Sequence, residues 1–142
     1  MTILKLCGRH VSTVPVLATV AEAVQLMIKN VVGAVAVVDD EGIVAGMFTE
    51  RDVLEKFVLS GRDPHQTPVR ELMSPMVEMA TEETTPAEAL RVMLERHYRH
   101  MPVVDERGKV LGILSIRHIL EHRIDDLLRQ LDDRAHTAAG NR

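Results

Sequence analysis

The stretch GMFTERDVLE, residues 46–55, has a near copy further along the chain. The copy is GILSIRHILE, residues 112–121, at an offset of 66 residues. Both segments keep a leading glycine, a hydroxyl residue, an arginine and a closing Leu-Glu, but Asp52 in the first copy becomes His118 in the second. The shared residues indicate a common fold requirement, and the carboxylate at Asp52 indicates a role that only one copy has.

The repeat extends over most of the chain. At the same offset the match runs without a gap from Ile3, which falls on Val69. Two longer segments match in the same way, TVAEAVQLM with TPAEALRVM and VAVVDDEGIVAGMF with MPVVDERGKVLGIL. Self-similarity at a fixed offset is the signature of a duplicated structural unit. A unit of about 60 residues buries little surface alone, so the two copies are expected to stack and share a core.

Within each copy the hydrophobic periodicity changes in a fixed order. A short strand, HVSTV or MVEMA, comes first. Apolar residues at helical spacing then follow a threonine that can cap the helix. Two apolar runs on either side of an acidic-glycine turn predict a β-hairpin. A second helix follows, from about Glu50 to Ser60 and from about Ile116 onward, so each copy is predicted to be β-α-β-β-α and the chain to be an α+β protein.

The same patterns give the boundaries. We expect a first repeat over residues 2–60, a turn-rich linker over 61–68, a second repeat over 69–126, and a helix extension and tail over 127–142. The tail TAAGNR is expected to fray. One apolar stripe runs along the last helix and suits pairing with another helix; it consists of Leu120, Ile124, Leu127, Leu128 and Leu131.

Composition narrows the class of protein. The chain has 142 residues, 46% of them hydrophobic and only 2% aromatic, which predicts an aliphatic core. A net charge of −4 argues against general nucleic-acid binding, which needs a basic face. The longest apolar run, VVGAVAVV, is too short to span a membrane, and the N-terminal residues lack the features of a signal peptide. The single Cys7 cannot form an internal disulfide, and together these features predict a cytoplasmic protein.

Both copies resemble cystathionine-β-synthase (CBS) domains, and the tandem resembles a Bateman module. The shared features are the AEA-type first helix, the PVVD-x-x-G hairpin, and a glycine followed by two apolar residues, Ser or Thr, two further residues and Asp. The resemblance covers about residues 2–126. It implies a pseudo-twofold disc with two clefts between the repeats, which in many members bind adenine nucleotides or related adenosyl compounds. The implied ligand is AMP, ADP or ATP, or alternatively S-adenosylmethionine or NAD(H), and no cofactor is required.

The resemblance places ribose and phosphate contacts of the first copy at Asp52 and Thr49. The two residues are three apart, so their side chains can converge where strand meets helix, and a carboxylate can accept hydrogen bonds from both ribose hydroxyls. Basic partners for the phosphate are expected mainly from the other repeat, at Arg99, His100 and Arg117. The adenine ring is expected among Met47, Val77, Met101 and Pro102.

The second cleft departs from this pattern. It would use Ser115 and His118 for the ribose, but a neutral histidine has one acceptor nitrogen and cannot take both hydroxyls. The facing residues would be Gly33, Ala34 and Arg51, and the loop that holds the first two carries no basic residue. We expect one competent cleft, at Asp52, and an empty or weak one at His118.

Other readings of the same residues stay open at this point. Asp52 is also an ordinary acidic residue for a first helical turn, and Arg99 with His100 is also an ordinary solvated loop. A ligand-free dimerisation module is the main alternative to a nucleotide sensor. A zinc site at His118 and His122 lacks further ligands, and no nucleophile, Walker or Rossmann pattern indicates an enzyme. The expected output is a regulatory signal from a homodimer to a separate effector protein, without nucleic acid or membrane partners.

Overall fold

The computed structural model describes residues 2–8, 10–76 and 78–140. It has the predicted α+β architecture, in which two halves repeat one another. The first half contains β1 (Thr13–Pro15), α1 (Val20–Asn30), β2 (Ala34–Val38), β3 (Val44–Thr49), α2 (Glu50–Asp52) and η2 (Val53–Phe57). The second half contains α3 (Pro86–Arg96), β4 (His100–Val104), β5 (Val110–Ser115) and α4 (Ile116–Gly140).

The first helix of each repeat begins as the sequence predicts. Thr19 caps α1, and its hydroxyl accepts from the Glu22 amide while the Glu22 carboxylate accepts from the Thr19 amide. Thr85 and Glu88 form the same reciprocal pair at α3. This capping box satisfies amide groups that have no partner within the helix. The helix starts are therefore encoded locally and at equivalent positions.

The hairpins are also equivalent. β2 pairs antiparallel with β3, and β4 with β5, with a register shift at Val37/Val38 in the first hairpin and at Val103/Val104 in the second. β1 adds a parallel strand to the first sheet. The predicted strand MVEMA is wrong as a strand, because the described part of this segment makes only a single bridge, from Ala80 to Val103.

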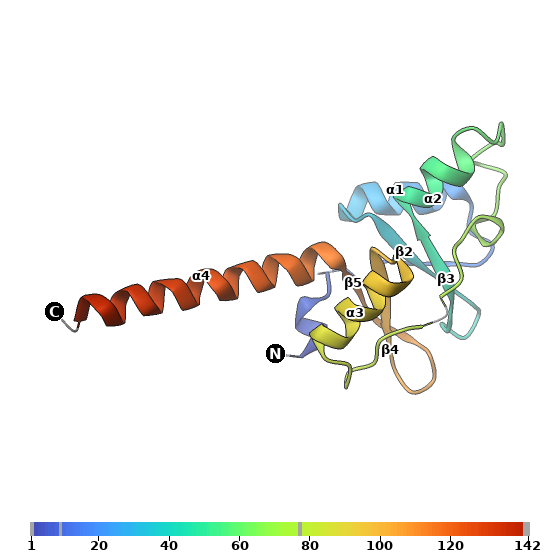
Figure 1. The fold of residues 1–142 in the computed structure, drawn as a ribbon. Helices are drawn as coiled ribbons and strands as arrows, with labels where there is room; N and C mark the ends of the chain where they lie inside the picture. Colours follow the sequence, from blue (N-terminus) through green and yellow to red (C-terminus); the bar gives the residue numbers. More distant parts are fainter. Residues whose placement is uncertain (1, 9, 77, 141–142) are drawn as a thin grey trace.

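The second helix differs most between the repeats. The helix predicted over about Glu50 to Ser60 is one α-helical turn, α2, followed by a π-helical segment, η2. Its counterpart α4 is a regular helix of 25 residues that continues through Gly140 and so includes residues 137–140 of the tail. Figure 1 shows α4 leaving the body of the molecule and running free for most of its length. Most of α4 is therefore helical without a core to pack against.

The two repeats exchange their leading segments. The 3₁₀ turn η1 (Ile3–Leu6) packs into the core of the second repeat with Met93 and Leu114. The equivalent turn η3 (Val69–Glu71) packs into the core of the first repeat, where Val69 lies against Phe48 and other buried residues. Each core is thus completed by the leading segment of the other repeat.

A third apolar cluster joins the halves. Ala34, Ala36, Met47 and Ile113 are buried together, so β2 and β3 of one sheet meet β5 of the other. The edges of these strands, where each sheet leads into its second helix, frame the clefts described below. Among the described residues, no helix is long and apolar enough to cross a membrane.

Candidate functional site

Two clefts lie between the repeats. The larger, about 600 Å³, is called the Asp52 cleft and is lined by Thr49, Glu50, Arg51, Asp52, Leu54, Glu55, Lys56, Ser74, Met76, Arg96, His97, Tyr98, Arg99 and His100. The smaller, about 300 Å³, is called the His118 cleft and is lined by Gly8, His10, Val31, Val32, Gly33, Ala34, Glu50, Arg99, His100, Ile113, Ser115, Ile116, Arg117 and His118. Both volumes fall in the range of small-molecule sites.

Asp52 is the most enclosed polar group of its cleft, with 4% of its surface exposed. Its Oδ2 accepts from the Thr49 amide at 3.0 Å and from the Thr49 hydroxyl at 3.1 Å. Its Oδ1 accepts from the Ser74 hydroxyl at 2.8 Å and lies 3.0 Å from Lys56 Nζ. An ionised carboxylate has about four acceptor positions, so these donors occupy the carboxylate fully.

The local sequence explains how this carboxylate is held. Thr49 ends β3 and caps α2, and Asp52 at the third helical position completes a capping box. The π-helical turn that follows widens the helix, and π-turns are found frequently at functional sites. Lys56 in this turn also donates to Ser74 Oγ and to the Leu72 carbonyl. The segment around Ser74, at the start of the second repeat, is therefore bound directly to the carboxylate.

Four of the predicted site residues share one cleft. Thr49 and Asp52 come from the first repeat, and Arg99 and His100 reach the same space from the second. Val77 lies outside the described residues.

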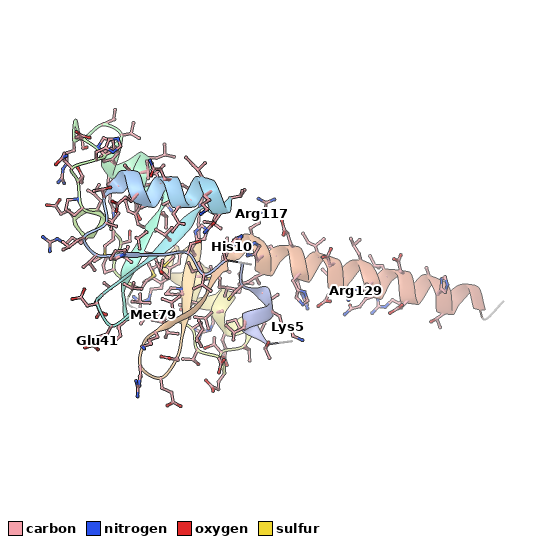
Figure 2. The ribbon with its side chains drawn as sticks, turned by 180° about the vertical axis from the view of Figure 1, so that it is seen from behind. Lys5, His10, Glu41, Met79, Arg117 and Arg129 are labelled. Carbon is pink, nitrogen blue, oxygen red and sulfur yellow. The ribbon has the colours of Figure 1, made fainter. Side chains whose placement is uncertain are left out.

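The other predicted site residues lie elsewhere. Met47 and Met101 are buried core residues, with 0% and 1% of their surfaces exposed, and Pro102 is buried within β4. Arg117 was expected beside the same phosphates but lines the His118 cleft, because it is the counterpart of Arg51 in the other repeat. Figure 2 shows Arg117 beside His10 where α4 leaves the body.

Residues that were not predicted from the sequence complete the Asp52 cleft. Glu50, Lys56 and Ser74 stand closest to the predicted pair, and Met76 and Tyr98 add further walls. The sequence does contain a signal for Ser74. At the repeat offset Ser74 matches Gly8, so this position, like that of Asp52 and His118, differs between the two copies. What the sequence did not show is that the segment of Ser74 crosses back to the first repeat, where Ser74 and Met47 exchange backbone hydrogen bonds.

The His118 cleft lacks the carboxylate, the hydroxyl and the ammonium group that meet at Asp52. At the positions equivalent to Asp52, Ser74 and Lys56 it has His118, Gly8 and His122. His122 turns to Asp126, at 3.3 Å. Nδ1 of His118 is buried and, among the described residues, has no hydrogen-bond partner. The asymmetry predicted from Asp52 and from the lack of basic residues in the loop facing His118 therefore extends to the residues that contact Asp52.

His100 stands on the wall that the clefts share. Burial lowers the pKa of its imidazole below the ordinary value, the nearby Glu50 carboxylate opposes this, and His118 and Arg99 lower the pKa further. The net direction is downward, so the imidazole loses its proton at a lower pH than a free histidine. His100 thus adds little positive charge to either cleft near neutral pH.

Comparison with known proteins identifies the family. The family model of the CBS domain matches residues 5–59 and again residues 69–125. The chain belongs to the CBS domain family. It carries two CBS domains in tandem, and CBS domain pairs are generally regulatory, non-catalytic modules that bind adenosine ligands and dimerise.

Individual relatives agree with this assignment. A putative signal-transduction protein with CBS domains from Burkholderia ambifaria MC40-6 superposes with a TM-score of 0.78 at 33% identity, covering 89% of this chain and 96% of that one. An uncharacterised 17.7 kDa protein of Acidianus ambivalens is 36% identical over 107 residues, which are 75% of this chain and 63% of that protein. The first curated relatives are longer, and the matched part spans between 14% and 63% of their length.

One structural relative bears on the metal alternative. Hypoxic Response Protein I, with two coordinated zinc ions, superposes with a TM-score of 0.75 at 28% identity, covering 86% of this chain and 98% of that one. Within residues 2–8, 10–76 and 78–140 of the present chain, no group of three or more His, Cys, Asp or Glu side chains is arranged to hold a metal ion.

Proposed function

We propose that this CBS pair is a regulatory module that binds an adenosyl ligand in the Asp52 cleft and signals to a partner protein. The observation that carries the proposal is the buried Asp52 carboxylate at a cleft that also contains Arg99 and His100 from the opposite repeat. A carboxylate in this position suits a ribose, whose two hydroxyls both donate hydrogen bonds. The Arg99 guanidinium opposite suits a phosphate, and the neutral His100 can add a hydrogen bond.

Ligand binding at Asp52 requires an exchange of partners. The carboxylate is already occupied by Thr49, Ser74 and Lys56, so a ribose hydroxyl takes its place only if the Ser74 hydroxyl or the Lys56 ammonium moves away. The Thr49 contacts belong to the helix cap and are expected to stay. Binding would thus loosen the contact between the first repeat and the segment that carries Ser74.

This exchange supplies a mechanism for a signal. The ligand would contact both repeats, and it would favour the arrangement in which Ser74 is released. A ligand shifts a conformational equilibrium only by its differential affinity for the two states. Ser74 and Lys56 contribute that difference, because their bonds to Asp52 exist in one state only. The surface that changes is then read by the partner protein.

The proposal is tested by thermal-shift titration of the protein with AMP, ADP, ATP, S-adenosylmethionine and NADH. We expect at least one of them to raise the melting temperature, because a ligand that binds only the folded state adds RT ln(1 + [L]/Kd) to the free energy of unfolding. The shift should therefore grow with the logarithm of ligand concentration above Kd. Uridine monophosphate is a matched control that keeps the ribose phosphate and changes the base. Absence of any such shift in a folded protein would contradict adenosyl binding.

A homodimer is the second proposal, and the exposed apolar residues favour it. Exposed apolar side chains occur in pairs related by the repeat offset, Ile28 with Leu94, Leu54 with Leu120 and Val58 with Ile124. The stripe then continues along the free part of α4 through Leu127, Leu128 and Leu131, each 45–59% exposed. A surface that repeats about a twofold axis suits association with a second copy of itself.

The double variant Leu127→Glu/Leu131→Glu is therefore expected to weaken self-association by more than tenfold in sedimentation analysis. Arg129 provides the control, because it is two positions from Leu127 and from Leu131 and so lies about 200° around the helix from both. Arg129→Glu changes the net charge by the same amount and leaves the stripe intact. If the double variant and Arg129→Glu had the same dissociation constant for self-association, pairing through the α4 stripe would be excluded. Association unchanged in the double variant would place the dimer contact on the body alone.

A further inference from the structure

The Asp52 cleft is rich in arginine and lysine, but most of these cations already have partners. Arg51 Nε lies 2.8 Å from Glu55, and Lys56 Nζ lies 3.0 Å from Asp52. Arg96 lies 2.6 Å from Glu78. Among the residues that the structure describes, Arg99 makes no ion pair and is the one arginine or lysine of the cleft free to meet a phosphate.

A carboxylate lines the same clefts as this free cation. Glu50 follows Thr49 and lines both clefts, as do Arg99 and His100. Its position is fixed at the backbone, where the Glu50 amide donates to the Gly33 carbonyl at 2.9 Å. The side chain passes over Gly33, since a Cβ on that glycine would lie 3.0 Å from Glu50 Oε1 and 3.4 Å from His100 Cε1. Glu50 and His100 therefore approach the same point from opposite repeats.

The surrounding charges do not offset this carboxylate fully. His100 is mostly neutral near pH 7 because burial lowers its pKa. Arg99 thus provides one full positive charge near Glu50, where a polyphosphate would need several. Each additional phosphate group brings further negative charge toward Glu50, and like charges in close approach disfavour binding.

We propose that the Asp52 cleft selects adenosyl ligands with one phosphate over those with two or three, and that Glu50 is the residue that sets this preference. The inference rests on the proposed adenosyl binding and names the ligand class within it. Arg99 meets the single phosphate, and Glu50 penalises the phosphates beyond it. In the second repeat the position equivalent to Glu50 is occupied by Ile116, which has no charge.

The test is isothermal titration of the full chain with AMP, ADP and ATP, at low ionic strength and with EDTA to remove Mg²⁺. Wild type is expected to bind AMP at least about fivefold more tightly than ATP, with ADP between them. In Glu50→Gln the ratio of the ATP to the AMP dissociation constant is expected to fall by about threefold or more. Glu50 is exposed, and glutamine keeps its shape, so the variant should fold.

Glu41→Gln is the matched control. It removes the same charge from the tip of the first hairpin, which lies far from His10 and Arg117 in Figure 2 and lines neither cleft. Its ATP-to-AMP ratio should equal that of wild type. Tighter binding of ATP than of AMP in wild type, or an unchanged ratio in Glu50→Gln, would overturn the inference while leaving adenosyl binding intact. Failure of all three nucleotides to bind, together with no thermal shift from S-adenosylmethionine or NADH, would overturn both.

Discussion

Replacing Gly46 by alanine is expected to lower the free energy of unfolding by about 2–3 kcal/mol, the upper part of the usual range for overpacking a tight site. A Cβ at Gly46 would lie 2.8 Å from the Ser74 carbonyl oxygen and 2.9 Å from Met73 Sδ. The Met73 side chain can move, but the Ser74 carbonyl cannot, because it accepts from the Met47 amide at 2.9 Å. The new methyl group would therefore push the whole segment off the first sheet.

Gly8→Ala provides the matched control in urea unfolding. Gly8 is the counterpart of Ser74, and a Cβ there would meet His118 Cε1 at 3.6 Å, an ordinary contact. We expect it to change stability by less than about 0.5 kcal/mol, as most substitutions without a specific clash do. A loss for Gly46→Ala no larger than that of Gly8→Ala would mean that the Ser74 segment does not lie as tightly on the sheet as described.

Asp52→Ala is expected to lower the free energy of unfolding by about 2–3 kcal/mol, since it leaves several buried donors unpaired. The donors are the amide and hydroxyl of Thr49 and the hydroxyl of Ser74, and Lys56 loses its ion pair. Lys56 is 39% exposed, and water will compensate part of that loss. Asp52→Asn keeps the shape and one acceptor oxygen, so a smaller loss of about 1 kcal/mol is expected.

The equivalent substitution in the second repeat distinguishes the loss of hydrogen bonds to Asp52 from the general effect of shortening a side chain. His118→Ala removes a side chain whose Nδ1 has no hydrogen-bond partner among the described residues. Its loss in urea unfolding is expected to be smaller than that of Asp52→Ala by more than 1 kcal/mol. Equal losses would indicate that the bonds to Asp52 contribute little. Because Asp52→Ala is itself destabilising, Asp52→Asn is the better variant for binding measurements.

The fold could be predicted because the duplication repeats local signals. The threonine caps at Thr19 and Thr85 and the acidic-glycine turns determine helix starts and hairpins within a few residues of sequence. The exchange of η1 and η3 could not be predicted this way. Ile3 and Val69 read as buried residues, but a hydrophobic pattern does not say which of two similar cores receives them.

Part of the candidate site could be predicted from the sequence, with Arg99 and His100 expected from the resemblance to CBS domains. Thr49 and Asp52 are three residues apart, and their convergence follows from helix geometry. Ser74 reaches Asp52 across the exchanged segment, and Arg117 lies at the other cleft, so both depend on the placement of whole elements. Met47 was predicted as a ligand wall, but β3 turns it inward to the cluster that joins the repeats.

The most direct test of the central claim is calorimetric titration of the chain with AMP, comparing wild type, Asp52→Asn and His118→Asn. We expect one AMP bound per chain in wild type and in His118→Asn, and an affinity at least tenfold weaker in Asp52→Asn. Asparagine has a single acceptor oxygen, which cannot serve both the Thr49 cap and the ribose hydroxyls. Two equivalent sites per chain, or one site lost in His118→Asn and retained in Asp52→Asn, would contradict the assignment of the ligand to the Asp52 cleft.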